Sequence, residues 1–377
     1  MKCLALLLLA LVSSAQAADK KAVQPAGAGK PLGPYSPGIA TGNYLYVSGQ
    51  IARKPDGSLA QGIDAQIAQA LENVRGVVES AGLKMANVVY ADVYLADVNN
   101  YEALNRVWGK YFSSAPPARS VIGVRAMPAS TPVEISAVAI RNLALRKPVR
   151  TPTPRAGAPI ASGVMVDNRF FLGGLVGRDF ATQRVPEDAR EQVDLAIERA
   201  SMVLRTAGLE LRHLASATIY IDAQVPMDKL AKILADVLPS ETAVTVVRAE
   251  SLPFGAHFEI TGVASRLARR EGHCTSVAET LYCSARAGGI DTALKYVQQD
   301  LQAAKSSPSM VVSSKLFLDS IDNYNAVNSA YAKVFPSDPP ARVTLQPSNT
   351  APELTLAPGT DRGKPEGGPQ VQLSVIA

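Results

Sequence analysis

Residues that bind metals or drive nucleophilic catalysis are scarce in this chain of 377 residues, which has three histidines, three cysteines and one tryptophan. His213, His257 and His273 are scattered and show no metal-ligand spacing, so we expect no metal site. With so few histidines, no Ser-His-Asp arrangement is indicated either. The sequence therefore argues against a metalloenzyme and against a hydrolase of the serine type.

Long apolar runs are also rare, and the marked one lies at the N-terminus. Residues 1–17, MKCLALLLLALVSSAQA, have a short basic start, an apolar run and a small-x-small end at Ala15 and Ala17. This pattern predicts a secretory signal peptide cleaved after Ala17, followed by a flexible leader over 18–30. The run is too short for a permanent membrane helix, which needs ~20 residues. We therefore expect a mature protein that is periplasmic or secreted, with no membrane segment.

Acidic residues are fewer than basic ones, 33 against 38, which gives a net charge of +5. Part of the basic excess lies in two runs, residues 141–155 and 265–270. A nucleic-acid surface would interleave aromatic residues with the basic ones, and these runs contain none. We interpret both runs as solvated linkers and expect no nucleic-acid partner.

Two cysteines remain after removal of the signal peptide, Cys274 and Cys283. If Ala278 and Glu279 form a two-residue hairpin turn, the two cysteines face each other across antiparallel strands. An oxidising compartment favours a disulfide between them. The alternative is a pair of buried thiols.

A long amphipathic helix is predicted three times, at residues 62–83, 190–209 and 289–307. In the first copy, apolar residues recur at the spacing of one helical face. The second copy ends on the same Ala-Gly-Leu, and the third opens with the same Gly-Ile-Asp. The chain therefore contains an internal repeat.

The elements that follow each long helix recur as well. A short second helix carries the pattern Tyr-x-x-x-Asn in copies one and three, at Tyr101/Asn105 and Tyr324/Asn328. Before it comes a strand with an aromatic centre, at Tyr94, Tyr220 and Phe317. A closing strand recurs at residues 133–139, 258–264 and 371–377.

Hairpins precede the first two long helices, with turns at Gly42-Asn43 and Asp167-Asn168. Each unit thus has the order ββαβαββ, an α+β arrangement. Helices cover one face of such a sheet, and three units can cover the other face for each other. The predicted units span residues 31–147, 153–267 and 270–377.

Five motifs of the first unit carry a resemblance to a known family. They are GPYSPG, YVSGQI, ENVRGVVESAGL, DVYLADVNNYEALNRVWGKYF, and PPARS followed by PVEISAVAI. The unit resembles the Rid/YjgF family of enamine/imine deaminases, RidA-like proteins with a chorismate-mutase-like fold. These form homotrimers with a central β-barrel and ligand clefts between protomers. The resemblance implies a monomeric, intramolecular pseudo-trimer with a central β-barrel.

The resemblance also implies roles for residues of the first unit. Arg119, in Pro-Ala-Arg-Ser, would grip the substrate carboxylate with its planar fork. Glu134 on the closing strand would position the attacking water. The implied substrate-binding residues are Tyr35, Ser48, Gly49 and Asn105.

The second unit keeps fewer of these residues. Our alignment places Thr242 at the position of Arg119, Ile160 at that of Tyr35 and Gly173 at that of Ser48. Glu259 is retained on the closing strand, so we expect no complete site from this unit.

The third unit keeps Arg342 and Ser284, which make a possible secondary site. Arg342 would bind a carboxylate or pair with an acidic neighbour. Gln372 replaces the glutamate if residues 371–377 are the closing strand, whereas Glu353 would match it if PELTLA is that strand.

The implied reaction is hydrolysis of 2-imino or enamine acids to 2-keto acids and ammonia. It requires a carboxylate anchor and an oriented water, and no cofactor. The expected partner is a small carboxylate or imino acid. The alternative is a non-catalytic module that binds or senses small carboxylates, which the changes at Thr242 and Gln372 favour.

Overall fold

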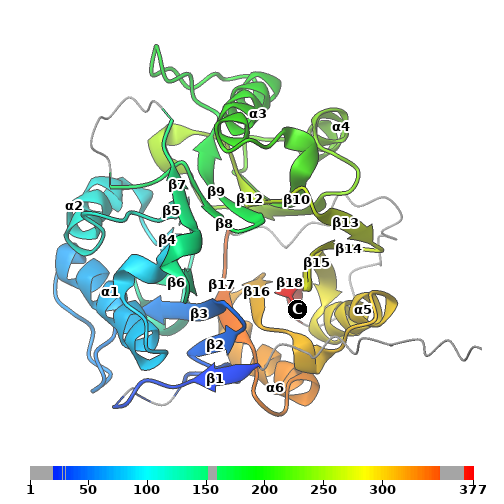
Figure 1. Ribbon diagram of the computed structural model, residues 1–377. Coiled ribbons are helices and arrows are strands. Elements are labelled where there is room, and N and C mark those ends of the chain that lie inside the picture. Colours follow the sequence, from blue (N-terminus) through cyan, green and yellow to red (C-terminus); the bar gives the residue numbers. More distant parts are fainter. Residues whose placement is uncertain (1–19, 28, 30, 152–158, 349–368) are drawn as a thin grey trace, which may run out of the picture.

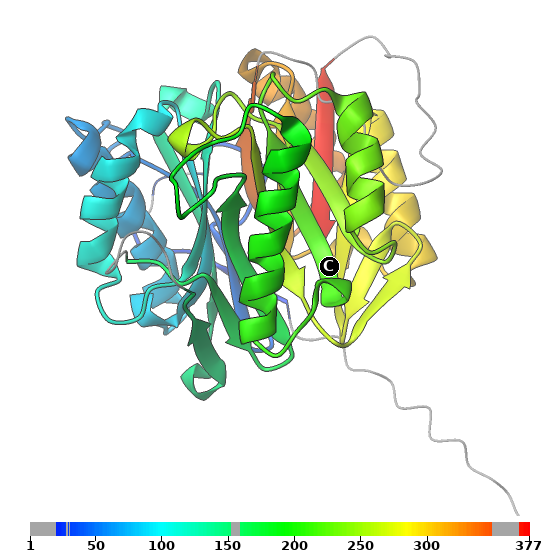
Figure 2. The same ribbon diagram turned by 90° about the horizontal axis from the view of Figure 1, so that it is seen from above.

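The computed structural model describes residues 20–27, 29, 31–151, 159–348 and 369–377. The predicted signal peptide and Glu353 lie outside these residues. Three six-stranded sheets, each with one long and one short helix on one face, surround a common centre (Figure 1). The helices lie on the outside and the sheets face inward, as the turned view also shows (Figure 2). The three tandem α+β units predicted from the sequence are therefore confirmed.

Unit 1 contains helices α1 (Ile63–Ser80) and α2 (Tyr101–Tyr111). Its sheet has the order β1-β2-β3-β6-β4-β5, in which only β4 and β5 are parallel. The strands are β1 (Lys21–Val23), β2 (Gly38–Thr41), β3 (Tyr44–Ile51), β4 (Val88–Leu95), β5 (Ala118–Gly123) and β6 (Val133–Ile140).

Unit 2 contains α3 (Ala189–Thr206) and α4 (Met227–Val237), and its sheet has the order β11-β10-β12-β9-β8-β7. The strands are β7 (Arg146–Val149), β8 (Gly163–Val166), β9 (Arg169–Val176), β10 (Leu214–Ile221), β11 (Ala243–Arg248) and β12 (Phe258–Ala264).

Unit 3 contains α5 (Ile290–Ala303) and α6 (Tyr324–Val334), and its sheet has the order β13-β14-β15-β18-β16-β17. The strands are β13 (Ala268–Glu271), β14 (Cys274–Val277), β15 (Thr280–Gly289), β16 (Ser313–Leu318), β17 (Ala341–Leu345) and β18 (Gln370–Ile376).

Each unit buries one apolar core between its sheet and its helices, and further clusters join the units at the centre. Tyr94, Tyr220 and Phe317, the predicted aromatic strand centres, are fully buried in one such shared cluster. The units thus cover each other's sheets, which follows from helices on only one face.

Two features differ from the sequence-based prediction. Each sheet has a sixth strand, β1, β7 or β13, which pairs with the first strand of the hairpin. Part of the leader predicted as flexible is therefore strand, and the basic runs predicted as linkers contribute β7 and β13. The strand pairing of the described residues also forms three separate sheets, joined by isolated bridges, rather than one closed barrel.

The predicted hairpins are present, because Thr41 pairs with Tyr44 and Val166 with Arg169 across the expected turns. The third hairpin brings Cys274 opposite Cys283, and the two are joined by a disulfide. This confirms the disulfide rather than the pair of thiols.

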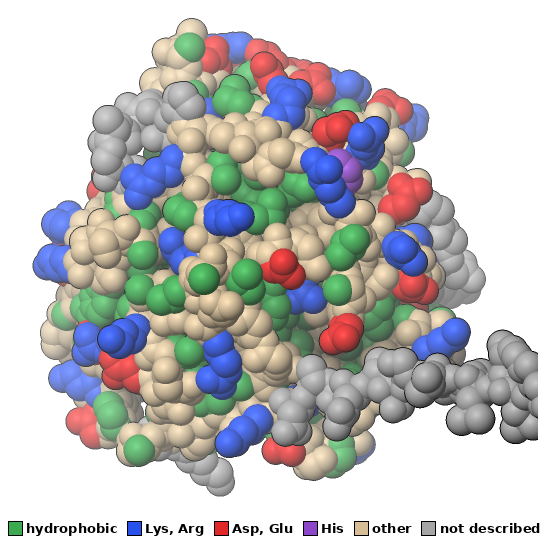
Figure 3. All heavy atoms as spheres, viewed as in Figure 1, with side chains coloured by type: hydrophobic (Ala, Val, Ile, Leu, Met, Phe, Trp, Pro, Cys, Tyr) green, Lys and Arg blue, Asp and Glu red, His purple; other side chains and the backbone are tan. Residues whose placement is uncertain are grey.

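The surface seen in Figure 3 mixes basic and acidic side chains around scattered hydrophobic ones. Within the part of the chain that the structure describes, every helix is too short or too polar to cross a membrane. The same residues contain no cluster of three or more His, Cys, Asp or Glu side chains that could hold a metal ion.

Candidate functional site

Each unit meets the next along one pair of strands, which creates three interfaces. Strand β3 packs against β17, β5 against β9, and β11 against β15. We call these interfaces the 1–3, 1–2 and 2–3 clefts after the units that form them. The predicted site residues are divided among all three.

The 1–3 cleft is organised around the hydroxyl of Ser48 on β3. The backbone N–H of Arg342 donates to Ser48 Oγ at 2.8 Å, and this hydroxyl donates to the carbonyl of Ser36 at 2.6 Å. Ser48 therefore fixes β17 of unit 3 against the loop that carries Tyr35. Tyr35, Ser48 and Arg342 are thus held in one place.

The guanidinium of Arg342 is pre-positioned as an anchor for an anion. Its Nη2 donates to Asn328 Oδ1 at 2.7 Å, and its Cζ lies 4.8 Å from the ring centre of Tyr331 and 5.4 Å from that of Tyr35. Arg342 is 3% exposed, and its Nε and Nη1 have no hydrogen-bond partner among the described residues. Each of these two N–H groups can donate a charge-assisted hydrogen bond to an anion.

Glu134 on β6 is the acidic group of the same cleft and is 3% exposed. Burial raises the pKa of its carboxyl to about 8, and the charge of Arg342 opposes that rise. Its Oε1 lies so close to Gly49 that a Cβ there would stand 1.7 Å away. Gly49 therefore makes room for the carboxyl group.

Tyr35 closes the cleft from the leader side. The backbone N–H of Leu32 donates to its hydroxyl at 3.3 Å, and burial raises the pKa of this phenol to about 12. The phenol therefore stays neutral and can donate a hydrogen bond at neutral pH.

Arg119 lies in a different cleft, which corrects its predicted pairing with Glu134. Arg119 Nη2 donates to Asn105 Oδ1 at 2.6 Å, as Arg342 does to Asn328. The cavity beside Arg119 is lined by Glu259 of unit 2. The reason is geometric: β5 is the outer strand of its sheet and faces unit 2, whereas Glu134 lies on a central strand that faces unit 3.

The second correction concerns unit 2, where Val244 rather than Thr242 matches Arg119. Arg119, Val244 and Arg342 pair with Ala91, Ala217 and Ser314, each three residues before the aromatic strand centre. Thr242 instead donates its hydroxyl to the carbonyl of Leu214. The 2–3 cleft therefore has no arginine at this position.

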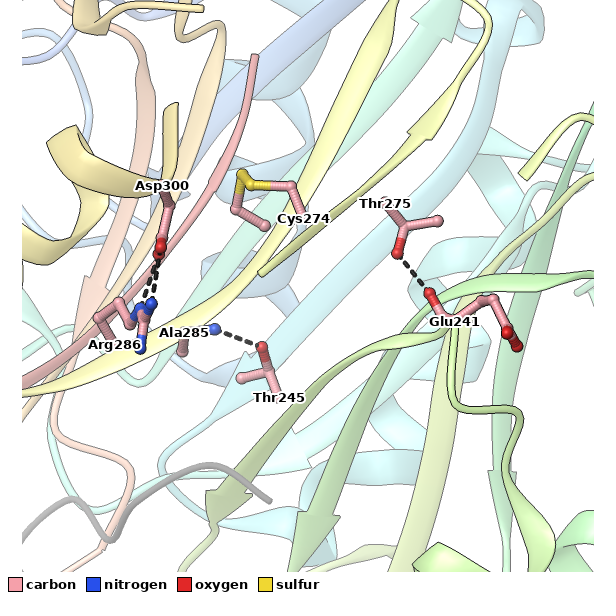
Figure 4. Close-up of a disulfide and its surroundings, with 8 residues drawn as sticks. Glu241, Thr245, Cys274, Thr275, Ala285, Arg286 and Asp300 are labelled. Carbon is pink, nitrogen blue, oxygen red and sulfur yellow. Dashed lines mark hydrogen bonds and ion pairs between the residues drawn. A yellow bond between two sulfur atoms is a disulfide. The ribbon is translucent and has the colours of Figure 1, made fainter. Parts of the chain in front are cut away.

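Other contacts lie at the 2–3 cleft (Figure 4). Across it, the N–H of Ala285 donates to Thr245 Oγ1 at 2.9 Å, and beside it, within unit 3, Arg286 forms an ion pair with Asp300 at 2.6 Å. Gln372 pairs with Phe317, as Glu134 does with Tyr94, so it occupies the position of the glutamate. Its side chain donates to the carbonyl of Val246 at 2.7 Å.

Ser284, predicted for a secondary site with Arg342, lies at the 2–3 interface instead. It follows Cys283 on β15, and its hydroxyl is buried without a partner among the described residues. Arg342 and Ser284 therefore do not share a cleft.

Asn328 and Ser36 belong to the 1–3 cleft and were missed as site residues. The signal for Asn328 was available, because Tyr-x-x-x-Asn recurs in units 1 and 3, the two units that contribute an arginine. Ser36 acts through its backbone carbonyl, which leaves no mark in the sequence.

The chain was compared with known proteins. A RutC family protein of Saccharolobus solfataricus is 39% identical over 115 residues, 30% of this chain and 91% of that protein. The 2-iminobutanoate/2-iminopropanoate deaminase of Salmonella typhimurium is 36% identical over 115 residues, 29% of this chain and 90% of that protein. The solved structure of E. coli TdcF with bound serine is 31% identical, with a TM-score of 0.32, and the match covers 33% of this chain and 100% of that one.

The family model described as Endoribonuclease L-PSP matches this chain three times, at residues 26–141, 151–266 and 278–356. Each segment overlaps one of the three units, the third ending before β18, and together they make up most of the sequence. The chain therefore belongs to the Endoribonuclease L-PSP family, the Rid/YjgF family that its motifs resemble.

Proposed function

We propose that the 1–3 cleft hydrolyses 2-imino acids, and the enamine acids that tautomerise to them, to 2-keto acids and ammonia. The observation that carries the proposal is the presence of Arg342 and Glu134 in one buried cleft, with open donors on the arginine. A relative that matches 29% of this chain bears the name of this activity, the Salmonella typhimurium deaminase.

The substrate carboxylate accepts a hydrogen bond from an open N–H of Arg342, at Nε or Nη1, which holds the imine carbon beside Glu134. The carboxylate of Glu134 takes a proton from a water as the water oxygen bonds to that carbon of the N-protonated imine, giving a carbinolamine. The protonated Glu134 then returns the proton to the nitrogen. The C–N bond breaks as the hydroxyl group becomes the keto group and gives its proton to Glu134, which passes it to the departing ammonia. A carboxyl with a pKa of about 8 suits both steps near neutral pH.

The test is an imine-hydrolysis assay on the chain without residues 1–17, with 2-iminopropanoate generated in situ. Arg342→Met and Glu134→Gln are each expected to lower kcat/KM by about 100-fold or more. Arg119→Met is the matched control, because it removes the other arginine of the same motif and should keep turnover. Loss of turnover in Arg119→Met, with Arg342→Met active, would reverse the assignment.

A parent protein without turnover would favour the alternative, a module that binds small carboxylates. In that case carboxylate binding should still disappear in Arg342→Met. We also propose that the mature chain is periplasmic or secreted, which the Cys274–Cys283 disulfide supports. Two titratable thiols in protein isolated from cells under non-reducing conditions would contradict this location.

A further inference from the structure

The 1–2 cleft holds a cavity of about 250 Å³ that the proposed reaction does not use. It lies between α2 and β5 of unit 1 and β9, β12, α3 and three connecting segments of unit 2. Its lining differs from that of the 1–3 cleft in ways that indicate another class of ligand.

Arg119 supplies an anchor for an anion in this cavity. It is 4% exposed, and its Cζ lies 4.9 Å from the ring centre of Trp108. Its Nη1 is buried and has no hydrogen-bond partner among the described residues. Glu102 and Glu259 also line the cavity, but with Arg178 and Arg199 it has three basic groups against these two acidic ones. A carboxylate is the group that fits here.

The floor of the cavity has lost the polar groups of the 1–3 cleft. Ile160 stands where unit 1 has Tyr35, and Gly173 stands where it has Ser48; both line the cavity. One phenol and one hydroxyl are therefore replaced by an aliphatic side chain and by free space. This change favours an apolar substituent on the ligand.

The rim adds aromatic side chains, Phe254 and Phe180. The ring of Phe254 lies 5.0 Å from that of Tyr101, across the unit boundary, and 4.6 Å from Cζ of Arg178. Phe254 is 43% exposed and has a φ of 66°, a left-handed backbone that a bulky residue seldom adopts. Unit 1 has Ala129 at the matching turn position, with a φ of 57°, so this backbone belongs to the fold and the ring is what unit 2 adds at the mouth of the cavity.

Glu259 is engaged by neighbours that its counterpart Glu134 lacks. Ser120 Oγ donates to Glu259 Oε1 at 2.5 Å, and the N–H of Val121 also donates to this carboxyl group. In the 1–3 cleft the residue that matches Ser120 is Val343, which has no hydroxyl. Glu259 is therefore poorly placed to orient a water.

From these observations we propose that the 1–2 cleft is a second site, which binds carboxylates with an aromatic or bulky apolar substituent and does not hydrolyse them. The carboxylate binds Arg119, and the substituent lies among Ile160, Phe180 and Phe254. This proposal does not depend on deamination in the 1–3 cleft.

Trp108 gives a direct readout, because it is the only tryptophan of the chain and lies against Arg119. The matching ring beside Arg342 is Tyr331, so tryptophan emission reports on the 1–2 cleft alone. The experiment is a titration of the full mature chain with 3-phenylpropanoate and with propanoate. We expect a saturable change in emission, with Kd about tenfold or more lower for 3-phenylpropanoate, because its ring is buried.

Three variants decide the assignment. Arg119→Met should weaken 3-phenylpropanoate binding by about tenfold or more, and Phe254→Gly should weaken it severalfold while relieving the backbone strain. Arg342→Met, the matched control, should bind like the parent. No response in the parent, equal Kd for propanoate, or retained binding in Arg119→Met would overturn the proposal. If Arg119→Met does not fold by circular dichroism, an unchanged Kd in Phe254→Gly would overturn it.

The absence of hydrolysis is tested separately with 2-imino-3-phenylpropanoate generated in situ. The Glu134→Gln variant leaves the 1–2 cleft intact, so we expect it to show no turnover of this substrate above the rate in buffer. Turnover that disappears on adding Arg119→Met to Glu134→Gln would show that the 1–2 cleft is a second catalytic site and would overturn this part of the proposal.

Discussion

At the scale of the residue, the surroundings of the Glu134 side chain determine the pKa of its carboxyl group. A carboxyl in water loses its proton readily, but burial removes the hydration that stabilises the charge. Arg342 supplies a compensating charge from the neighbouring unit, and the pKa of Glu134 still rises to about 8. The protonation state of Glu134 near neutral pH therefore differs between the folded protein and the unfolded chain.

That difference predicts how stability depends on pH. The pKa of Glu134 is raised from 4.5 to about 8 on folding, so between these values the folded protein binds more proton than the unfolded chain. The contribution of Glu134 to the free energy of unfolding is largest below pH 4.5. It falls as the pH rises from 4.5 to about 8 and is constant above that. Glu134→Gln should therefore make the midpoint of urea unfolding less dependent on pH between 5 and 8.

The control for this measurement is Glu187→Gln, which changes an exposed glutamate of unit 2. It should follow the parent at every pH. An equally steep pH dependence in Glu134→Gln and in the parent would show that Glu134 is ionised in the folded protein. Glu259, whose pKa burial also raises to about 8, should behave like Glu134 when changed to Gln.

At the scale of elements, the hairpin strand and the closing strand of each sheet are matched to one another. Gly49 faces Glu134, and Gly174 faces Glu259. A Cβ added to Gly174 would lie 2.2 Å from Oε1 of Glu259, too close for any side chain. Unit 3 has Ala285 and Gln372 at the same two positions. The closing strand thus has glutamate in the two units whose hairpin strand has glycine, and it has glutamine in the unit whose hairpin strand has alanine.

This relation predicts the effect of Gly49→Ala. The new Cβ would stand 1.7 Å from Oε1 of Glu134, so the carboxyl group must move. Misplacement of about 1 Å can cost about 100-fold in rate, so we expect a loss of that size in kcat/KM. Overpacking should also lower the free energy of unfolding by about 1–3 kcal/mol.

Gly76→Ala is the matched control, because the nearest atom to its added Cβ lies 4.0 Å away on Pro25. Gly76 is inside α1, where alanine should raise the free energy of unfolding by about 0.5–1 kcal/mol. Imine hydrolysis that survives in Gly49→Ala at the parent rate would mean that Glu134 need not occupy its observed position.

Most elements of the fold could be predicted because their signals are local. Helical periodicity placed α1, α3 and α5 within a few residues of their ends, and two-residue turns placed the hairpins. The edge strands β1, β7 and β13 were not predicted. Their short or basic sequences are strands because a hairpin beside them offers unpaired backbone groups, which is a tertiary effect.

The candidate site was predictable only in part, because it is shared between units. The motifs identified Tyr35, Ser48, Gly49 and Glu134, which do lie together. They also suggested Arg119, since it is in the same unit. The structure instead supplies Arg342, which is 294 residues from Ser48 in the sequence. Which edge of a sheet meets which neighbour is decided by the packing of whole units.

At the scale of the whole molecule, covalent linkage allows the three units to differ where they meet. Asp92, Thr218 and Lys315 occupy the same position, since they pair with Ser136, Thr261 and Ser374 on the closing strands. Lys315 Nζ lies 2.8 Å from Asp92 Oδ2, and Tyr90 donates to Asp92 Oδ1 at 2.8 Å. A trimer of identical chains would place three like residues here and could not form this ion pair.

The ion pair also determines the last prediction. Lys315→Met leaves the carboxylate of Asp92 buried without its cation, which should lower the free energy of unfolding by about 3–5 kcal/mol. The double variant Asp92→Thr with Lys315→Thr makes all three positions alike and should recover most of that loss, because no unpaired charge remains. Urea unfolding followed by circular dichroism measures both, and light scattering should give the mass of one chain throughout. If Lys315→Met were as stable as the parent, or the double variant less stable than the single one, the buried pair would not be what holds units 1 and 3 in register.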